Sequence, residues 1–292
     1  MFPDAIENRH IYPIPQKKET PKSETKSNSP VSLLPTLGKI LEKLLLERLN
    51  FHLRTNNLQA ANQYGFTVNK SPEEAIVDFI DEIEMARSTK QHAWVISLDV
   101  KGAFDHLEYN SIKNSLNNIN FHSNRKETLI DLLSDRQVAL KTRQGPDTLP
   151  QHRGCPQGSC AAPAFWNLVA NEVLTQSWPE GVHLQAFADD FIFLIKAPTK
   201  AKVRFLANEA LNQFKSWAAK HNLEISADKS NYMYFNKNRN GSRWSAGIRW
   251  DGNHLRRKSS IKYLVIFIDD KLKDTKPLSK NKKYRCVKLG SE

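Results

Sequence analysis

The chain has 292 residues, of which 39% are hydrophobic and 25% charged, so it is long enough for one or two folded cores of ordinary composition. Lys and Arg outnumber Asp and Glu by 43 to 31, and the resulting net charge of +12 suits a polyanionic partner. The sequence has no apolar run of membrane-spanning length and no signal peptide at Met1 to Asp4, which argues against a membrane protein. Three cysteines without a framework spacing favour a reducing compartment such as the nucleus or cytosol.

The first part of the chain combines a polar segment with two predicted helices. Residues 1–30 are basic and rich in proline, and they leave two alternatives open, a disordered leader or an irregular finger over a phosphate channel. Helical periodicity begins near Thr36, and Ser71-Pro72-Glu73-Glu74 has the pattern of a capping box that starts a second helix. Buried faces are expected at Leu37, Ile40, Leu41, Leu44, Leu45 and Leu49 in the first helix and at Ile76, Phe79, Ile80 and Ile83 in the second.

The rest of the chain alternates between strand and helix patterns. Strands are predicted at residues 93–99 and 137–142, with Gly145 to Asp147 as the turn after the second strand. Helices are predicted around residues 109–119, at residues 163–174 and along the stripe from Val203 to Trp217, and short strands near residues 223–226, 231–236 and 261–268. This order predicts an α+β fold in which helices cover one face of a sheet.

Two adjacent acids, Asp189 and Asp190, lie between the apolar runs 182–188 and 191–195, which predict a β-hairpin with the acids at its tip. Neighbouring carboxylates repel each other unless a cation compensates their charge. Two Mg²⁺ ions about 4 Å apart between shared carboxylates are typical of nucleotidyl transfer. Because Asp is also a common turn residue, the pair by itself leaves a solvated turn open.

A third acid, Asp99, ends the predicted strand 93–99. A carboxylate at a strand end can hold a metal ion, and the amides of the turn that follows can wrap a triphosphate. Those amides belong to Val100, Lys101, Gly102 and Ala103. Phe104 could lie under the sugar of a nucleotide and exclude a 2′-hydroxyl by its bulk, although a core position is the alternative for an isolated Phe.

The loop 154–159 is rich in Gly and Pro and brings backbone close to a neighbour. Gln157 offers a donor and an acceptor to a base or a template sugar, and Gly158 has no side chain to obstruct that contact. An ordinary turn is the other interpretation of this loop.

The order and spacing of these motifs resemble the palm of reverse transcriptases. Asp-x4-Phe at 99–104, Pro-Gln-Gly at 156–158 and Phe-Ala-Asp-Asp at 187–190 match three palm motifs. The chain looks like the LINE-type, non-LTR retrotransposons, in particular their jockey-like arthropod branch. The resemblance covers residues 10–270, because 30–43 and 63–66 are similar to fingers motifs, 223–230 to a lysine motif and 262–264 to the primer-grip hairpin.

The resemblance implies a right-hand polymerase of fingers and palm, whose palm is a ferredoxin-like antiparallel sheet with packing helices. The implied activity is RNA-directed DNA synthesis from dNTPs on an RNA template, with a DNA primer or target. Asp99, Asp189 and Asp190 would hold two Mg²⁺ ions, and Lys229 would protonate or stabilise the leaving pyrophosphate. The dNTP and template site would comprise residues 100–104 with Gln157 and Gly158, and the primer grip Lys262, Tyr263 and Leu264.

The resemblance also predicts a domain organisation. Residues 1–30 would be a leader or finger strand, 31–92 fingers helices, 93–270 the palm with a fingers insertion at about 107–150, and 271–292 a basic tail. The chain ends soon after the primer grip, so we expect a truncated or decayed copy in which the thumb is largely absent and the upstream endonuclease is missing. Target-primed synthesis implies a nuclear location with passage through the cytoplasm, and no membrane.

Three positions depart from the family pattern. Ser29 and Thr67 stand where the family has arginines, and Val265 replaces the Gly of the primer-grip turn, where a β-branched residue is expected to distort the backbone. These changes leave a non-catalytic nucleic-acid-binding remnant as the alternative to an active polymerase. A group II intron maturase fits less well, because the Phe-Ala-Asp-Asp motif favours a retrotransposon reverse transcriptase.

Overall fold

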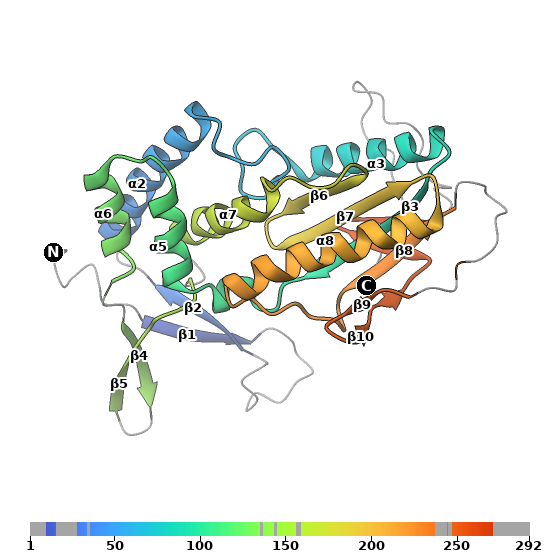
Figure 1. The fold of residues 1–292 in the computed structure, drawn as a ribbon. Coiled ribbons are helices and arrows are strands. Elements are labelled where there is room, and N and C mark those ends of the chain that lie inside the picture. The colour runs from blue at the N-terminus through green and yellow to red at the C-terminus, as the bar shows by residue number, and fades with distance from the viewer. Residues whose placement is uncertain are drawn as a thin grey trace. The chain divides into compact units, whose positions relative to one another are not determined.

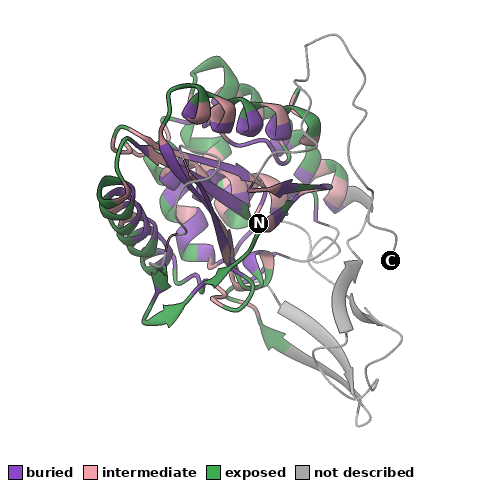
Figure 2. Cartoon of the chain, turned by 90° about the vertical axis from the view of Figure 1, so that its right-hand side faces the viewer, coloured by how far each residue is buried: buried purple, intermediate pink, exposed green. Residues whose placement is uncertain are grey.

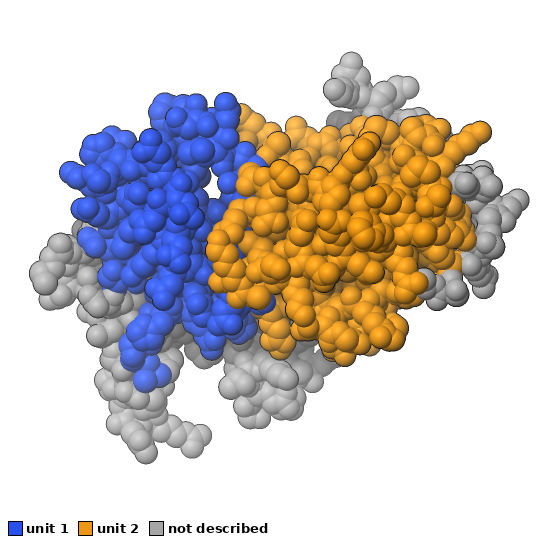
Figure 3. Space-filling model, viewed as in Figure 1, with its two compact units in different colours: residues 1–60, 102–171, 221–223 blue, residues 61–101, 172–220, 224–292 orange. Residues whose placement is uncertain are grey.

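The structure, a computed structural model, describes residues 10–15, 28–33, 36–134, 137–142, 145–155, 159–236, 244 and 247–270. Gln157, Gly158 and the expected basic tail 271–292 lie outside these residues. The chain forms two compact units (Figure 3): unit 1 comprises residues 1–60, 102–171 and 221–223, and unit 2 comprises residues 61–101, 172–220 and 224–292. Within the described ranges, none of the helices has the length and apolar character needed to cross a membrane.

Unit 2 is built around a five-stranded sheet of order β11-β8-β3-β7-β6. All neighbouring strands are antiparallel except β11 and β8, which are parallel. The strands of the sheet are β3 (His92–Asp99), β6 (Val182–Phe187), β7 (Asp190–Ala197), β8 (Asn231–Phe235) and β11 (Arg256–Arg257). Unit 2 also contains α3 (Pro72–Ser88), α8 (Lys200–Lys220) and the hairpins β9 (Arg249–Trp250)–β10 (Asn253–His254) and β12 (Ser260–Tyr263)–β13 (Ile266–Asp269) (Figure 1).

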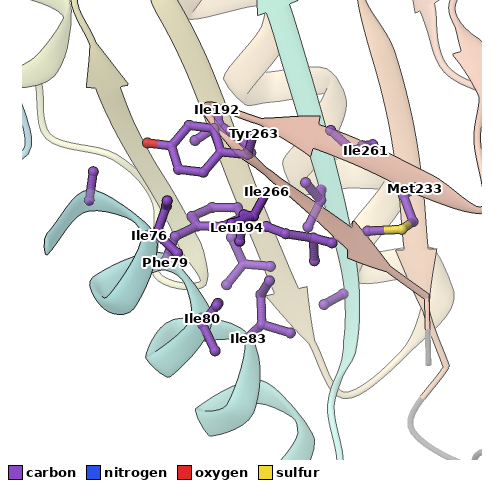
Figure 4. Packing of buried hydrophobic residues seen from close by; sticks show 14 of the residues in the cluster. Ile76, Phe79, Ile80, Ile83, Ile192, Leu194, Met233, Ile261, Tyr263 and Ile266 are labelled. Carbon is purple, nitrogen blue, oxygen red and sulfur yellow. The ribbon is translucent and has the colours of Figure 1, made fainter. Parts of the chain in front are cut away.

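Helix α3 and the hairpin β12–β13 cover one face of this sheet. The expected capping box starts α3: Glu74 N donates to Ser71 Oγ over 3.2 Å, and Ser71 N donates to Glu74 Oε2 over 3.1 Å. The expected apolar stripe of α3 is buried against side chains from β3, β7, β8, β12 and β13 (Figure 4). The stripe consists of Ile76, Phe79, Ile80 and Ile83, and its partners include Val95, Ile192, Leu194, Met233, Ile261 and Ile266.

Helix α8 covers the opposite face with aromatic side chains. The Phe214 ring lies 5.1 Å from that of Phe191 and 5.6 Å from that of Phe193. The expectation that helices cover one face of the sheet was therefore wrong. Strands β3 and β7 are apolar without alternation, and a strand of this kind is buried on both faces, as Figure 2 shows for the central strands.

Unit 1 contains a four-stranded sheet of order β2-β1-β4-β5 and several helices. The strands are β1 (His10–Pro15), β2 (Asn28–Leu33), β4 (Gln137–Thr142) and β5 (Gly145–Pro150), so Gly145 to Asp147 begin a strand and are not the expected turn. Strands β1 and β2 lie in or next to the segment that the sequence left open as a leader or a finger. The helices are α2 (Thr36–Thr55), α4 (Ala103–His106), α5 (Tyr109–Asn118), α6 (Ser123–Asp131) and α7 (Ala161–Leu174), the last of which continues into unit 2 beyond Asn171.

The buried side of α2 differs from the expected stripe. Ile40 and Leu44 are 52% and 53% exposed, whereas Glu42 is 2% exposed. Glu42 begins the observed stripe, which continues through Leu45, Leu46, Leu49 and Leu53. The expectation was therefore correct for Leu45 and Leu49 and wrong for Ile40 and Leu44, because the buried side also includes the acid Glu42.

Two of the expected short strands have a different form. Residues 223–226 are not a strand, because only Ile225 pairs, in an isolated bridge to Val100. The segment 261–268 is the hairpin β12–β13. The expected boundaries between fingers and palm stay a prediction.

The contacts of Phe214 predict its contribution to stability. Phe214 is fully buried, so Phe214→Ala should lower the free energy of unfolding by about 3–5 kcal/mol in urea denaturation. On the same helix, Phe205 is 59% exposed, and Phe205→Ala should change it by no more than about 0.5 kcal/mol. Equal effects of the two substitutions would contradict the packing of α8.

Candidate active site

The antiparallel pairing of β3 and β7 brings two acids together. Asp99, the last residue of β3, lies directly opposite Asp190, the first residue of β7. Residues in such positions have Cα atoms about 4.5–5.5 Å apart, so the two carboxyl groups start from neighbouring points of the backbone. Asp189 precedes Asp190 in the turn from β6 to β7, as expected for the hairpin. All three acids therefore lie at one end of the sheet of unit 2.

The environment of these acids disfavours their charged forms. Burial raises the pKa of the Asp189 carboxyl and the charge of Asp99 raises it further, while a backbone hydrogen bond and Lys229 lower it. Partial loss of hydration also raises the pKa of Asp190, and the charges of Asp189 and Asp99 add to this effect. The three carboxylates thus repel one another when they are ionised.

Lys229 approaches this cluster from the loop after α8. Its Nζ lies 3.6 Å from Asp99 Oδ2. The loop is fixed to the end of β3, because Ser226 N donates to Asp99 O over 2.9 Å and Asp99 N donates to Ser230 Oγ over 3.1 Å. The Lys229 side chain is 70% exposed and that of Asp99 32%, so the ammonium group remains accessible from solvent.

The acid cluster fits a divalent cation that is only partly coordinated by protein. Asp99 Oδ2 is buried and has no hydrogen-bond partner, and the cation that faces it in this structure is the Lys229 ammonium group at 3.6 Å. In the described part of the chain, no group of three or more His, Cys, Asp or Glu side chains is arranged so that it could hold a metal ion by itself. Mg²⁺ is commonly bound by one or two carboxylates together with water and substrate phosphates, so a complete protein cage is not required.

The residues expected to bind the triphosphate follow Asp99 along the chain. Val100 is buried, and Lys101 Nζ lies 3.1 Å from a carboxylate oxygen of Glu224. Gly102 has φ of 53° and is the N-cap of α4, so the expected backbone turn is present. Ala103 is buried in α4. The ring of Phe104 lies 5.7 Å from that of Trp166 and is only partly buried, so both the sugar contact and the core position stay open.

The expected primer grip is the hairpin β12–β13. Lys262 is exposed, whereas Tyr263 is buried and its hydroxyl accepts a hydrogen bond from Gln185 Nε2 over 2.7 Å. The turn between the strands consists of Leu264 and Val265, and Leu264 has the left-handed φ of 53°. Val265 is not in the left-handed region and is 65% exposed, so the expected distortion of the turn by this residue stays a prediction.

Two buried polar residues near the motifs were not predicted as functional. Glu42 Oε2 accepts hydrogen bonds from Ser159 Oγ over 3.1 Å and from Cys160 N over 3.2 Å, at the start of α7. Gln63 contacts the backbone of Ala188, immediately before the paired acids. An acid within an apolar helical stripe is a usable signal for Glu42, whereas Gln63 could be found only from the motif that contains it.

A hairpin with two acids at its tip, paired in register with a strand that ends in a third acid, is the arrangement of a polymerase palm. The model of the reverse transcriptase (RNA-dependent DNA polymerase) family matches residues 16–268. The chain belongs to this family.

Curated relatives support the same assignment. The chain is 30% identical over 251 residues to a retrovirus-related Pol polyprotein from type-1 retrotransposable element R1 of Bradysia coprophila, which covers 86% of this chain and 24% of that protein. It is also 28% identical over 277 residues to an RNA-directed DNA polymerase from mobile element jockey of Drosophila melanogaster. This match covers 93% of this chain and 30% of that protein. The chain thus spans less than a third of these relatives. The resemblance to reverse transcriptases of arthropod non-LTR retrotransposons is confirmed.

A solved structure supports the fold. Telomerase from Candida tropicalis in complex with a TWJ fragment of telomeric RNA has a TM-score of 0.64 at 13% identity, covering 98% of this chain and 47% of that one. The likeness concerns the fold, and it confirms the expected fingers and palm architecture.

Repulsion among the acids predicts a stability effect. The raised pKa of Asp189 means that ionisation of its carboxyl costs more free energy in the folded than in the unfolded chain. This destabilisation is absent below the pKa of Asp in the unfolded chain, about 3.9, and is complete above the pKa in the folded chain. Asp189→Asn in metal-free buffer should therefore raise Tm at pH 8, by about 2 °C for each kcal/mol relieved. The gain should shrink as the pH falls towards 4.

Calorimetry of both proteins over this pH range measures the difference. The control is Asp81→Asn, which removes an exposed acid from α3 and should change Tm by about 1 °C or less at every pH. A lower Tm for Asp189→Asn at pH 8 would contradict the repulsion.

Proposed function

We propose that this chain is the RNA-directed DNA polymerase domain of a non-LTR retrotransposon. In this function it extends the 3′-hydroxyl of a primer with dNTPs on an RNA template. The observation that carries the proposal is the position of Asp99 opposite Asp190, with Asp189 in the adjoining turn. A carboxylate cluster of this kind stabilises its charges best when it binds divalent cations.

Mg²⁺ is the cation that we propose, and Asp99, Asp189 and Asp190 are the residues that would hold it. Their ligand atoms are all hard carboxylate oxygens, which suit Mg²⁺ better than softer metals. When bound, the metal would activate the primer hydroxyl and neutralise charge on the triphosphate. The acids of this chain keep the site negative and orient the incoming groups.

Lys229 has the position of a mobile cation beside the acids. Its Nζ is close to Asp99 and its side chain is mostly exposed, so the ammonium group can turn from the carboxylate towards a leaving pyrophosphate. In that position it would donate a proton to, or stabilise the charge of, the leaving group.

The net charge of +12 supports a nucleic-acid partner. A polyanionic template and primer would be attracted by this excess of positive charge, with weaker binding at high salt. Thr67 Oγ1 donates to Gly65 O over 3.3 Å, so at one position where the family has a cation this chain has a hydroxyl that bonds locally. A nuclear location, expected from target-primed synthesis, stays a prediction.

Primer extension on an RNA template with Mg²⁺ tests the proposed activity. The wild-type chain should incorporate dNTPs, and Asp189→Asn should lower the rate at least about 10³-fold, because it removes a ligand to the charge-stabilising metal. Asp81→Asn should retain the wild-type rate.

Equal incorporation by wild type and Asp189→Asn would overturn the assignment of the acids. RNA binding by the wild type without any incorporation would show a nucleic-acid-binding protein that lacks polymerase activity.

Phe104 allows a separate prediction about the choice of sugar. If its ring excludes the 2′-hydroxyl, Phe104→Val should lower the preference for dNTPs over ribonucleotides by about 10- to 200-fold, measured as a ratio of kcat/KM values. If Phe104 acts through its contact with Trp166 alone, Tm should fall and the preference should remain unchanged.

A further inference from the structure

The turn that carries the paired acids has an unfavourable backbone. Phe187 pairs with Asp190, so only Ala188 and Asp189 form the turn between β6 and β7. Ala188 has φ of 57°, in the left-handed region that residues with a Cβ atom rarely adopt. The position of both acids therefore depends on a conformation that the local sequence does not favour.

One side chain holds this conformation through hydrogen bonds. Gln63 Oε1 accepts a hydrogen bond from Ala188 N over 3.1 Å, and Gln63 Nε2 donates to Ala188 O over 3.4 Å. Gln63 Oε1 also accepts from Gly65 N over 3.1 Å. Gln63 is only 1% exposed, so water cannot easily replace these bonds and their loss would cost free energy.

The backbone around Gln63 is fixed to the same hairpin. Tyr64 N donates to Ala186 O and Ala186 N donates to Asn62 O, each over 2.9 Å. Gly65 packs so closely that a Cβ atom on it would lie 2.1 Å from Ala188 N. The segment 62–65 thus continues the pairing along the outer edge of β6, and only glycine fits at its point of contact with the turn.

Helix α3 in turn holds this segment. The hydroxyl of Tyr64 donates to Asp78 Oδ2 over 2.5 Å, and the Nζ of Lys70 lies 4.3 Å from the centre of the Tyr64 ring. Asp78 lies within α3, whose apolar face packs on the sheet. The contact between Gln63 and Ala188 is therefore supported from the core and is not a loose surface interaction.

We propose that Gln63 is a positioning residue that holds the Ala188 turn in its left-handed conformation and thereby keeps Asp189 and Asp190 against Asp99. Gln63 acts through the backbone of Ala188, to which both ends of its side-chain amide are hydrogen-bonded. Repulsion among the three acids favours their separation, and Gln63 opposes that separation from the far side of the turn. This inference rests on the proposed function for its catalytic meaning, but the effect on the turn itself does not depend on that function.

The test compares two substitutions in the same segment. Gln63→Met keeps the side-chain volume and removes all three hydrogen bonds. Asn62→Ala is the matched control, because it removes the bond from Asn62 Nδ2 to Leu184 O, 3.0 Å long and farther from the turn. Gly65→Ala is a second variant, which leaves Gln63 intact and pushes a methyl group into Ala188.

The first measurement is hydrogen exchange of the Ala188 amide in metal-free protein. We expect at least tenfold faster exchange in Gln63→Met and Gly65→Ala than in wild type, and wild-type exchange in Asn62→Ala. Unchanged exchange in both Gln63→Met and Gly65→Ala would overturn the inference, as would equal acceleration in Asn62→Ala. A variant that does not fold can be replaced by the other, since both disturb the same turn.

The second measurement is binding of Mn²⁺ alone, followed by electron paramagnetic resonance. Gln63→Met should raise the Mn²⁺ concentration at half-saturation about tenfold, and Asn62→Ala should leave it unchanged. Equal Mn²⁺ affinity in wild type and Gln63→Met would show that the turn does not position the acids. Absence of Mn²⁺ binding by the wild type would contradict the proposed function, and the exchange experiment would still decide the role of Gln63 in the turn.

Discussion

The structure depends on one costly arrangement, the placement of Asp99 and Asp190 at directly opposite positions of two central strands. Burial raises the pKa of Asp190 most, and the charges of Asp189 and Asp99 raise it further, so the ionised carboxylates destabilise the sheet end that carries them. Burial of apolar side chains supplies the free energy that offsets this cost, because both strands are apolar almost throughout. Burial on both faces by α3 and α8 holds β3 and β7 in a register that electrostatic repulsion alone would disfavour.

Polar contacts then fix what hydrophobic packing leaves adjustable. Ser230 accepts a hydrogen bond from the amide of Asp99, and Gln63 binds both backbone groups of Ala188. Gln185 Nε2 donates to Ala75 O over 2.8 Å and to the Tyr263 hydroxyl over 2.7 Å, which joins β6 to α3 and to β12. Buried, satisfied amides of this kind define a single geometry, because any shift would leave a polar group without a partner. The site therefore has rigid support behind acids that remain partly open to solvent.

Local signals predicted much of the fold. The capping box at Ser71 and the apolar runs around the paired acids correctly gave the start of α3 and the hairpin β6–β7. The errors arose where tertiary contacts, and not the local sequence pattern, determine which residues are buried. Glu42 is buried because Ser159 and Cys160 donate to it from more than a hundred residues away, so helical periodicity missed it and wrongly placed Ile40 and Leu44 on the buried side of α2. A strand that is apolar without alternation indicates burial on both faces of the sheet. The expectation that helices cover only one face did not take this into account.

The apolar composition of β7 affects how strongly the register of the hairpin β6–β7 is specified. A strand with one polar face resists slippage, since a shift by one residue would expose its apolar set, but β7 is apolar on both sides. Size must then replace polarity as the guide: Phe191 and Phe193 fit the aromatic layer under α8, and the slimmer Ile192 and Leu194 fit beneath α3. An insertion of one residue in the turn could therefore give a chain that is still compact and soluble but in which Asp190 no longer lies opposite Asp99. Assays of expression or solubility would not detect this defect.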